Sequence, residues 1–179
     1  KVYVETLCNE FGEQYRPMWE DKILPLGSPK FDKVTNSFAD EIKIPEEWKT
    51  VLYNTDGCMK KVILYNTSVS ALLEHKEAML NKMRRVFKTF EENKEEVALL
   101  WRPHPLIKAT IESMLPSLWQ KYEKLVEEYK QAGWGIYDDT TDLNRALELA
   151  DAYYGDRSSL VQLCQEKGMP VMVQDCEVE

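Results

Sequence analysis

The feature that most constrains this chain is the alternation of short apolar runs, rich in β-branched and aromatic residues, with long amphipathic stretches. Such alternation is typical of βαβ units, whose strands build a parallel sheet. Strands are predicted at Lys22 to Leu26, Lys61 to Asn66, Glu96 to Arg102, Trp134 to Tyr137, Asp151 to Gly155 and Pro170 to Gln174. The predicted fold class is therefore α/β, a Rossmann-like parallel sheet of about six strands with helices on both faces.

Apolar residues at helical spacing predict the helices between these strands. A long surface helix is expected from about Ala71 to Asn93, with its Met and Phe stripe packed on the sheet. A second long helix begins or kinks at Pro116 and ends at Gly133. Shorter helices are expected to start at Pro45, at Leu143 behind a cap by Thr141 or Asp142, and at Ser158.

Length and composition limit the classes of protein that the chain can belong to. Its 179 residues suit one domain, which we expect over residues 21–179 after an entry segment at residues 1–20. The net charge of -8 argues against a broad nucleic-acid surface, and no apolar run is long enough to span a membrane. Scattered cysteines and two histidines give no metal site, and we expect no cofactor. The start at Lys1, with neither an initiator Met nor a signal-like segment, predicts an excised piece of a cytoplasmic protein.

Polar side chains follow three of the predicted strands, where an open parallel sheet binds its ligands. One loop carries Thr67 and Ser68, a second is Arg102-Pro103-His104-Pro105, and a third runs from Gly155 to Ser159. The hydroxyls of the first loop fit simple N-capping better than ligand binding. In the second, the prolines hold the His104 imidazole at the strand end and Arg102 supplies a cation suited to phosphate. A surface turn whose histidine satisfies only local hydrogen bonds explains that loop equally well.

The third loop, Gly155-Asp156-Arg157-Ser158-Ser159, precedes a predicted helix. Helix N-termini present free amides and a partial positive charge, so this backbone and its two hydroxyls could hold a diphosphate. The alternative is that Ser158 only caps the helix. The chain contains no Walker lysine and no GxGxxG run, which argues against a P-loop nucleotidase and an ordinary NAD dehydrogenase.

Together these motifs resemble a known family. The motifs are Leu26-Gly27-Ser28-Pro29-Lys30-Phe31-Asp32, Lys61-Val62-Ile63-Leu64-Tyr65, Arg102-Pro103-His104-Pro105, Ala150 to Leu160, and Gly168-Met169-Pro170-Val171. In order and spacing, from about Val4 to Asp175, they are similar to the C-terminal half of bacterial CDP-glycerol glycerophosphotransferases, which build teichoic-acid-type polymers. The resemblance implies a GT-B fold, in which the C-terminal Rossmann-like domain holds the nucleotide donor and an N-terminal domain binds the acceptor.

The resemblance also implies roles for single residues. His104 and Arg102 would be the catalytic residues facing the donor's phosphates. The donor would further be held by Thr67, Ser68, Asp156, Arg157, Ser158 and Ser159. The sequence departs from the family pattern twice: Thr67, Ser68 and Ser70 stand where the family has Pro-Thr and then Arg, and Arg157 replaces a Tyr.

The implied activity is transfer of glycerol phosphate, or a related alditol phosphate, from a CDP-linked donor to a cell-wall or surface polymer of the bacterial envelope. The implied partners are that donor, the polymer acceptor and the N-terminal acceptor domain, and the chain alone should be inactive. A longer parent protein could associate peripherally with the inner face of the membrane. The alternatives are the donor domain of a GT-B glycosyltransferase or nucleotide-sugar epimerase-like protein, and a non-catalytic nucleotide-binding module.

Overall fold

The computed structural model describes residues 2–24 and 42–174, and the chain divides into two compact units, Lys1–Asp32 and Lys33–Glu179. In the first unit, α1 (Val2–Phe11), the 3-10 turn η1 (Glu13–Tyr15) and α2 (Arg16–Lys22) follow one another. Arg16 links them, because its guanidinium bonds Glu5 on α1 and Glu13 on η1. The predicted boundary after residue 20 falls inside α2.

The strand predicted from Lys22 to Leu26 is wrong over its described part. Lys22 is the last residue of α2, and Ile23 and Leu24 belong to no strand. The backbone N–H of Ile23 donates to the Trp19 carbonyl at 2.9 Å, which continues the helical bonding to the first residue of the apolar pair. Pro25 and Leu26 lie outside the described residues, as does the rest of the Leu26–Asp32 motif.

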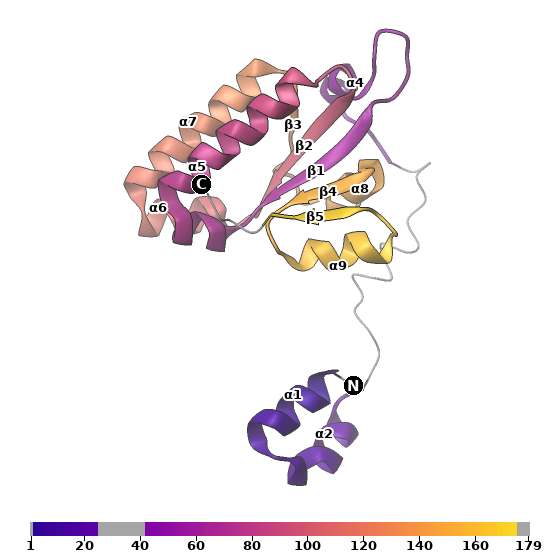
Figure 1. The fold of residues 1–179 in the computed structure, drawn as a ribbon, viewed down its shortest axis with the longest axis vertical. Coiled ribbons are helices and arrows are strands. Elements are labelled where there is room, and N and C mark those ends of the chain that lie inside the picture. Colours follow the sequence, from indigo (N-terminus) through magenta and orange to yellow (C-terminus); the bar gives the residue numbers. More distant parts are fainter. Residues whose placement is uncertain (1, 25–41, 175–179) are drawn as a thin grey trace. The chain divides into compact units, whose positions relative to one another are not determined.

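The second unit contains a parallel sheet, which confirms the predicted fold class (Figure 1). Its described strands are β1 (Lys61–Thr67), β2 (Val97–Pro103), β3 (Ile136–Tyr137), β4 (Ala152–Gly155) and β5 (Val171–Val173). They lie in the order β3-β2-β1-β4-β5, so the described sheet has five strands where about six were expected. None of the five extends more than one residue beyond its predicted range.

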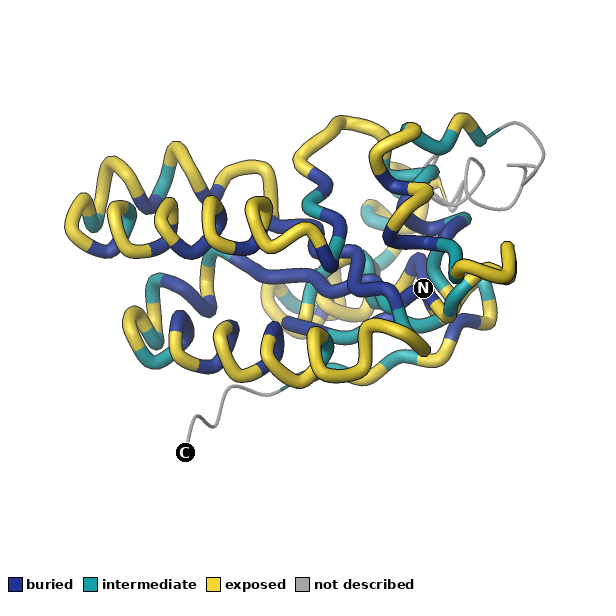
Figure 2. The backbone as a smooth tube through the Cα atoms, turned by 90° about the horizontal axis from the view of Figure 1, so that it is seen from above, coloured by how far each residue is buried: buried dark blue, intermediate teal, exposed yellow. Residues whose placement is uncertain are grey.

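Helices cover both faces of this sheet, as predicted (Figure 1). On one face lie α5 (Val69–Glu92), α6 (Ile107–Met114) and α7 (Pro116–Ala132); the other carries α8 (Leu143–Leu149) and α9 (Ser159–Glu166), and α4 (Glu46–Leu52) precedes β1. The α5–α7 side buries an aromatic core that includes Tyr65, Phe87 and Trp101. Figure 2 shows the consequence, with buried central strands and helices whose outer faces are exposed.

The predicted ends of these helices are largely confirmed. Gly133 ends α7 in the left-handed conformation with φ 67°, and Asp142 rather than Thr141 caps α8 by accepting from Arg145 N at 3.2 Å. Helix α6 was not predicted, because it is a short segment that lies between Pro105 and Pro116, the residue at which α7 begins. Among the described residues, no helix is long and apolar enough to cross a membrane.

Candidate functional site

The strand order reverses at β1, which has β2 and then β3 on one side and β4 and then β5 on the other. In open α/β sheets, the crevice beyond the carboxyl ends of the strands at such a switch point is the usual place for a ligand. The three loops named from the sequence meet at this edge. Asn66 near the end of β1 is in register with Arg102 on β2 and with Gly155 on β4.

Gly155 brings the end of β4 against β1. Its φ is +141°, and a Cβ atom built on it would lie 2.2 Å from the Asn66 carbonyl oxygen. The next residue, Asp156, donates its backbone N–H to the same oxygen at 3.0 Å. Only glycine fits this approach, and the approach fixes where the loop after β4 begins.

Asp156 joins the loop after β4 to the start of α5. Its side chain is buried, and Oδ2 accepts the backbone N–H of Ser68 at 2.7 Å. Ser68 is the N-cap of α5 and accepts the N–H of Ala71 at 3.1 Å. The protein's own carboxylate therefore occupies the electropositive end of α5, where the sequence resemblance had placed parts of the donor site.

Thr67 lies next to this contact but faces the core. It is fully buried, and its hydroxyl accepts the indole N–H of Trp101 at 3.1 Å. This bond ties β1 to β2 beneath the edge. In the described geometry, Thr67 contributes to the packing of the site and not to its surface.

A buried polar network on the other face, which the sequence analysis missed, connects three strands. Asn66 donates from Nδ2 to the Arg102 carbonyl at 2.8 Å and accepts the Tyr153 hydroxyl at 3.3 Å. The same hydroxyl contacts the Asp156 carbonyl. Burial raises the pKa of Tyr153 to about 12, so it stays a neutral hydrogen-bond donor at physiological pH. A polar residue inside an apolar strand, as Asn66 is, was the available signal.

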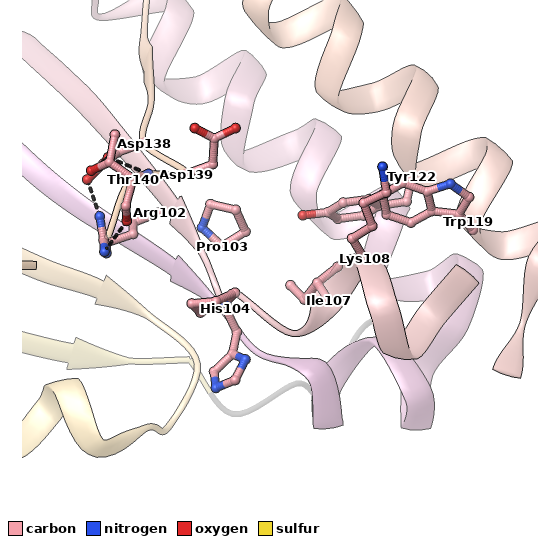
Figure 3. Close-up of a pocket in the computed structure, with 11 residues that line it drawn as sticks. Arg102, Pro103, His104, Ile107, Lys108, Trp119, Tyr122, Asp138, Asp139 and Thr140 are labelled. Atoms are coloured by element: carbon pink, nitrogen blue, oxygen red, sulfur yellow. Dashed lines mark hydrogen bonds and ion pairs between the residues drawn. The ribbon is translucent and has the colours of Figure 1, made fainter. Parts of the chain in front are cut away.

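The Arg102 side chain binds the loop that follows β3, and this is a second feature that the sequence analysis missed. Its guanidinium forms an ion pair with Asp138 and donates to the Thr140 carbonyl at 2.7 Å (Figure 3). The Arg102 side chain is 8% exposed and that of Asp138 is fully buried. Asp138 Oδ1 also accepts from Thr140 Oγ1 at 2.7 Å and lies 3.7 Å from Arg145. Arg102 thus fixes the loop after β3, and Asp138 offsets its charge.

His104 is exposed at the end of the β2 loop, and its backbone N–H donates to the Thr67 carbonyl at 2.9 Å. Its Nδ1 accepts the backbone N–H of Leu106 at 3.2 Å. A neutral ring that accepts at Nδ1 carries its proton on Nε2. Figure 3 shows the ring pointing away from Arg102 and Asp138. In this tautomer His104 presents an N–H donor at Nε2.

The loop from Gly155 to Ser159, which we call the serine turn, leads into α9. Ser158 is the N-cap and accepts the N–H of Leu160 at 3.2 Å, which confirms the predicted cap. Its hydroxyl also lies 3.3 Å from that of Tyr153. Arg157 and Ser159 are exposed on either side of it. The turn thus divides into a structural serine and two side chains that a ligand can reach.

A cavity of about 130 Å³ opens beside the β2 loop (Figure 3). Its lining includes Pro103 and His104 from that loop, Trp119 and Tyr122 from α7, and Asp139 from the β3 loop. Within residues 2–24 and 42–174, no group of three or more metal-ligating side chains comes together.

Comparisons with known proteins add little to this geometry. No protein-family model matches the chain, and no curated protein matches it. A solved structure of the wall teichoic acid polymerase TagF, a histidine-to-asparagine variant soaked with CDPG, is similar with a TM-score of 0.48 and 20% identity. The match covers 86% of this chain but only 32% of that protein, so the chain spans about a third of its length. At this level of likeness, function has to be argued from the site itself.

Proposed function

We propose that this chain is the donor-binding half of a two-domain transferase, which moves glycerol phosphate or a related alditol phosphate from a CDP-linked donor to a polymer hydroxyl. The observation that carries the proposal is the meeting of the His104 loop and the serine turn at one edge of the sheet, across its switch point. The motifs at that edge are those of the glycerophosphotransferase resemblance. A second domain would bind the acceptor and supply the general base, so this chain alone is inactive.

The donor's diphosphate would bind at the start of α9 and not at that of α5. Asp156 already places a carboxylate at the α5 end, which would repel a second anion there. At the α9 end, the exposed Ser159 hydroxyl and the Arg157 guanidinium can both approach a phosphate, and the helix dipole favours an anion there.

His104 would stabilise the charge that develops during transfer. Phosphoryl transfer places negative charge on the phosphate oxygens, and a fixed donor aimed at them lowers the barrier. The bond from Leu106 leaves Nε2–H as that donor. Arg102, paired with Asp138, serves in this proposal by holding the β2 and β3 loops in place.

Titration calorimetry on the 179-residue chain with CDP, UDP, GDP and ADP tests the proposal. CDP should bind most tightly, and both Ser159→Ala and His104→Gln should weaken its binding about tenfold, since each removes a hydrogen bond to a charged group. Ser113→Ala and His75→Gln, which change residues on α6 and α5 outside the site, are the matched controls.

Two other outcomes would redirect the assignment. Preference for UDP over CDP would favour a GT-B glycosyltransferase. Failure of any pyrimidine nucleotide to bind, with the fold intact, would favour a non-catalytic interaction module.

A further inference from the structure

The serine turn is held in place by one buried side chain, that of Tyr153 on β4. Tyr153 is 1% exposed, and its hydroxyl contacts the Asp156 carbonyl and lies 3.3 Å from the Ser158 hydroxyl. Asp156 and Ser158 are the two neighbours of Arg157, whose own side chain is exposed. A single hydroxyl therefore holds the chain on both sides of the cation of this turn.

The donors and acceptors around Tyr153 fix the direction of each hydrogen bond. A tyrosine hydroxyl has one proton, and a carbonyl oxygen can only accept it. The Asp156 carbonyl is the closest acceptor and takes the Tyr153 proton. The Ser158 hydroxyl then donates to the Tyr153 oxygen, while its own oxygen accepts the N–H of Leu160 at 3.2 Å. The Ser158 proton is used within the protein, so this serine does not donate to a phosphate.

Asn66 ties Tyr153 and the serine turn to the neighbouring strands. Its Oδ1 is a second acceptor at 3.3 Å from the Tyr153 hydroxyl, and its Nδ2 donates to the Arg102 carbonyl at 2.8 Å. The backbone carbonyl of Asn66 accepts the N–H of Asp156 at 3.0 Å. Both Asn66 and Tyr153 are buried, and a buried polar network whose members are paired makes its surroundings rigid.

A rigid turn matters for an anion because it orders the donors before the anion arrives. Arg157 and Ser159 are exposed side chains on backbone that these bonds hold. Donors on fixed backbone lose less freedom on binding than donors on a mobile loop, and the difference amounts to about three- to tenfold in affinity.

We infer that Tyr153, supported by Asn66, is the positioning residue of the diphosphate site. It touches no ligand, and it holds the serine turn in the shape in which Arg157 and Ser159 bind a phosphate. This inference rests on the proposed function, because the site is the one assigned there to the donor's diphosphate. It gives a role to two residues that were not among the site residues predicted from the sequence.

Calorimetry with pyrophosphate on the 179-residue chain, together with urea unfolding of each variant, tests the inference. Tyr153→Phe should weaken pyrophosphate binding about three- to tenfold, and Asn66→Ala should weaken it in the same way. Tyr129→Phe is the matched control, because Tyr129 is also buried and donates its hydroxyl to a strand carbonyl, that of Leu99, at 3.0 Å. It should lower the free energy of unfolding by a similar amount and leave pyrophosphate affinity unchanged.

A second comparison shows whether Tyr153 acts through Arg157. In a chain that carries Arg157→Ala, one of the positioned donors is gone, so Tyr153→Phe should weaken pyrophosphate binding less than it does in the wild-type chain. An equal loss in both backgrounds would contradict the inference, because it would mean that Tyr153 acts independently of Arg157.

The remaining outcomes distinguish the inference from the proposed function. Unchanged pyrophosphate affinity in Tyr153→Phe, or an equal loss in Tyr129→Phe, would overturn the positioning role and leave the phosphate site standing. If Tyr153→Phe does not fold, Asn66→Ala decides the question by the same criteria. Failure of pyrophosphate to bind the wild-type chain would overturn the proposed function and the positioning role together.

Discussion

Replacing Gly155 by alanine tests the contact that brings the end of β4 against β1 at the switch point. The added Cβ would lie 2.2 Å from the Asn66 carbonyl oxygen and 2.9 Å from the Asn66 nitrogen, both backbone atoms within the sheet. Neither atom can rotate away as a side chain could. The β1–β4 pairing must open, or Gly155 must leave its φ of +141°.

The expected cost has two parts. A side chain at such a φ costs of order 1–3 kcal/mol, and displacing strand backbone in a packed core adds about 1–3 kcal/mol more. We therefore expect Gly155→Ala to lower the free energy of unfolding by about 2–6 kcal/mol, a large share of the roughly 5–15 kcal/mol of an ordinary domain.

Urea unfolding followed by tryptophan fluorescence measures this loss against a matched control. Gly168 also has a positive φ, of 70°, but nothing lies within 4 Å of its virtual Cβ. Gly168→Ala should cost only the conformational part, about 1–2 kcal/mol. Equal losses in the two variants would refute the argument that close backbone approach is what requires Gly155.

Three further predictions concern stability. Asp138→Asn should destabilise the fold by about 3–5 kcal/mol in urea unfolding, because it leaves the buried Arg102 without its counter-charge; a loss below 1 kcal/mol would contradict that role. Ser158→Ala should lower the free energy of unfolding by about 1 kcal/mol, because the helix loses its cap, while Ser159→Ala at an exposed position should leave it unchanged. Thermal unfolding of both variants measures this, and a larger loss in Ser159→Ala than in Ser158→Ala would contradict it. Burial raises the pKa of Tyr153 from 10.0 to about 12, so it contributes stability below pH 10 that is lost as pH rises towards 12; Tyr153→Phe should flatten this part of the unfolding free energy against pH, and an unchanged slope would count against it.

The sequence predicted most of the sheet because strands and helices here follow local patterns. Runs such as Ala98 to Trp101 are buried on both faces, and the periodicity of α5 follows directly from its packing. The apolar pair Ile23-Leu24 led to the wrong prediction of a strand, because two apolar residues do not distinguish a strand from the end of a helix.

The site was predictable only as a set of loops. Parallel topology brings the ends of β1, β2 and β4 to one edge, so the loops with His104 and Ser158 could be named from the sequence. Their partners are long-range: Arg102 pairs with Asp138 and Asp156 with Ser68, across 36 and 88 residues of sequence. No local sequence pattern predicts that Arg102 pairs with Asp138 or that Asp156 accepts from Ser68. These pairings show that the Arg102 side chain contacts Asp138 and that the Thr67 hydroxyl contacts Trp101, where motif reasoning had both residues facing a donor.

Asp156 is where the motif and the geometry disagree most, and Asp156→Asn separates them. An asparagine oxygen can still accept the Ser68 N–H, whereas the interaction of the charge with the α5 dipole is lost, at a cost of about 0.3–1 kcal/mol. If the carboxylate only closes the α5 end, removing its charge should strengthen pyrophosphate binding several-fold at low salt, and the gain should shrink as salt screens the field. If Asp156 instead touches the donor, as the family resemblance implies, the same change should weaken CDP-glycerol binding with the fold intact. Calorimetry of Asp156→Asn at two salt concentrations, with Asp142→Asn at the α8 cap as the control, distinguishes the two by the sign of the change.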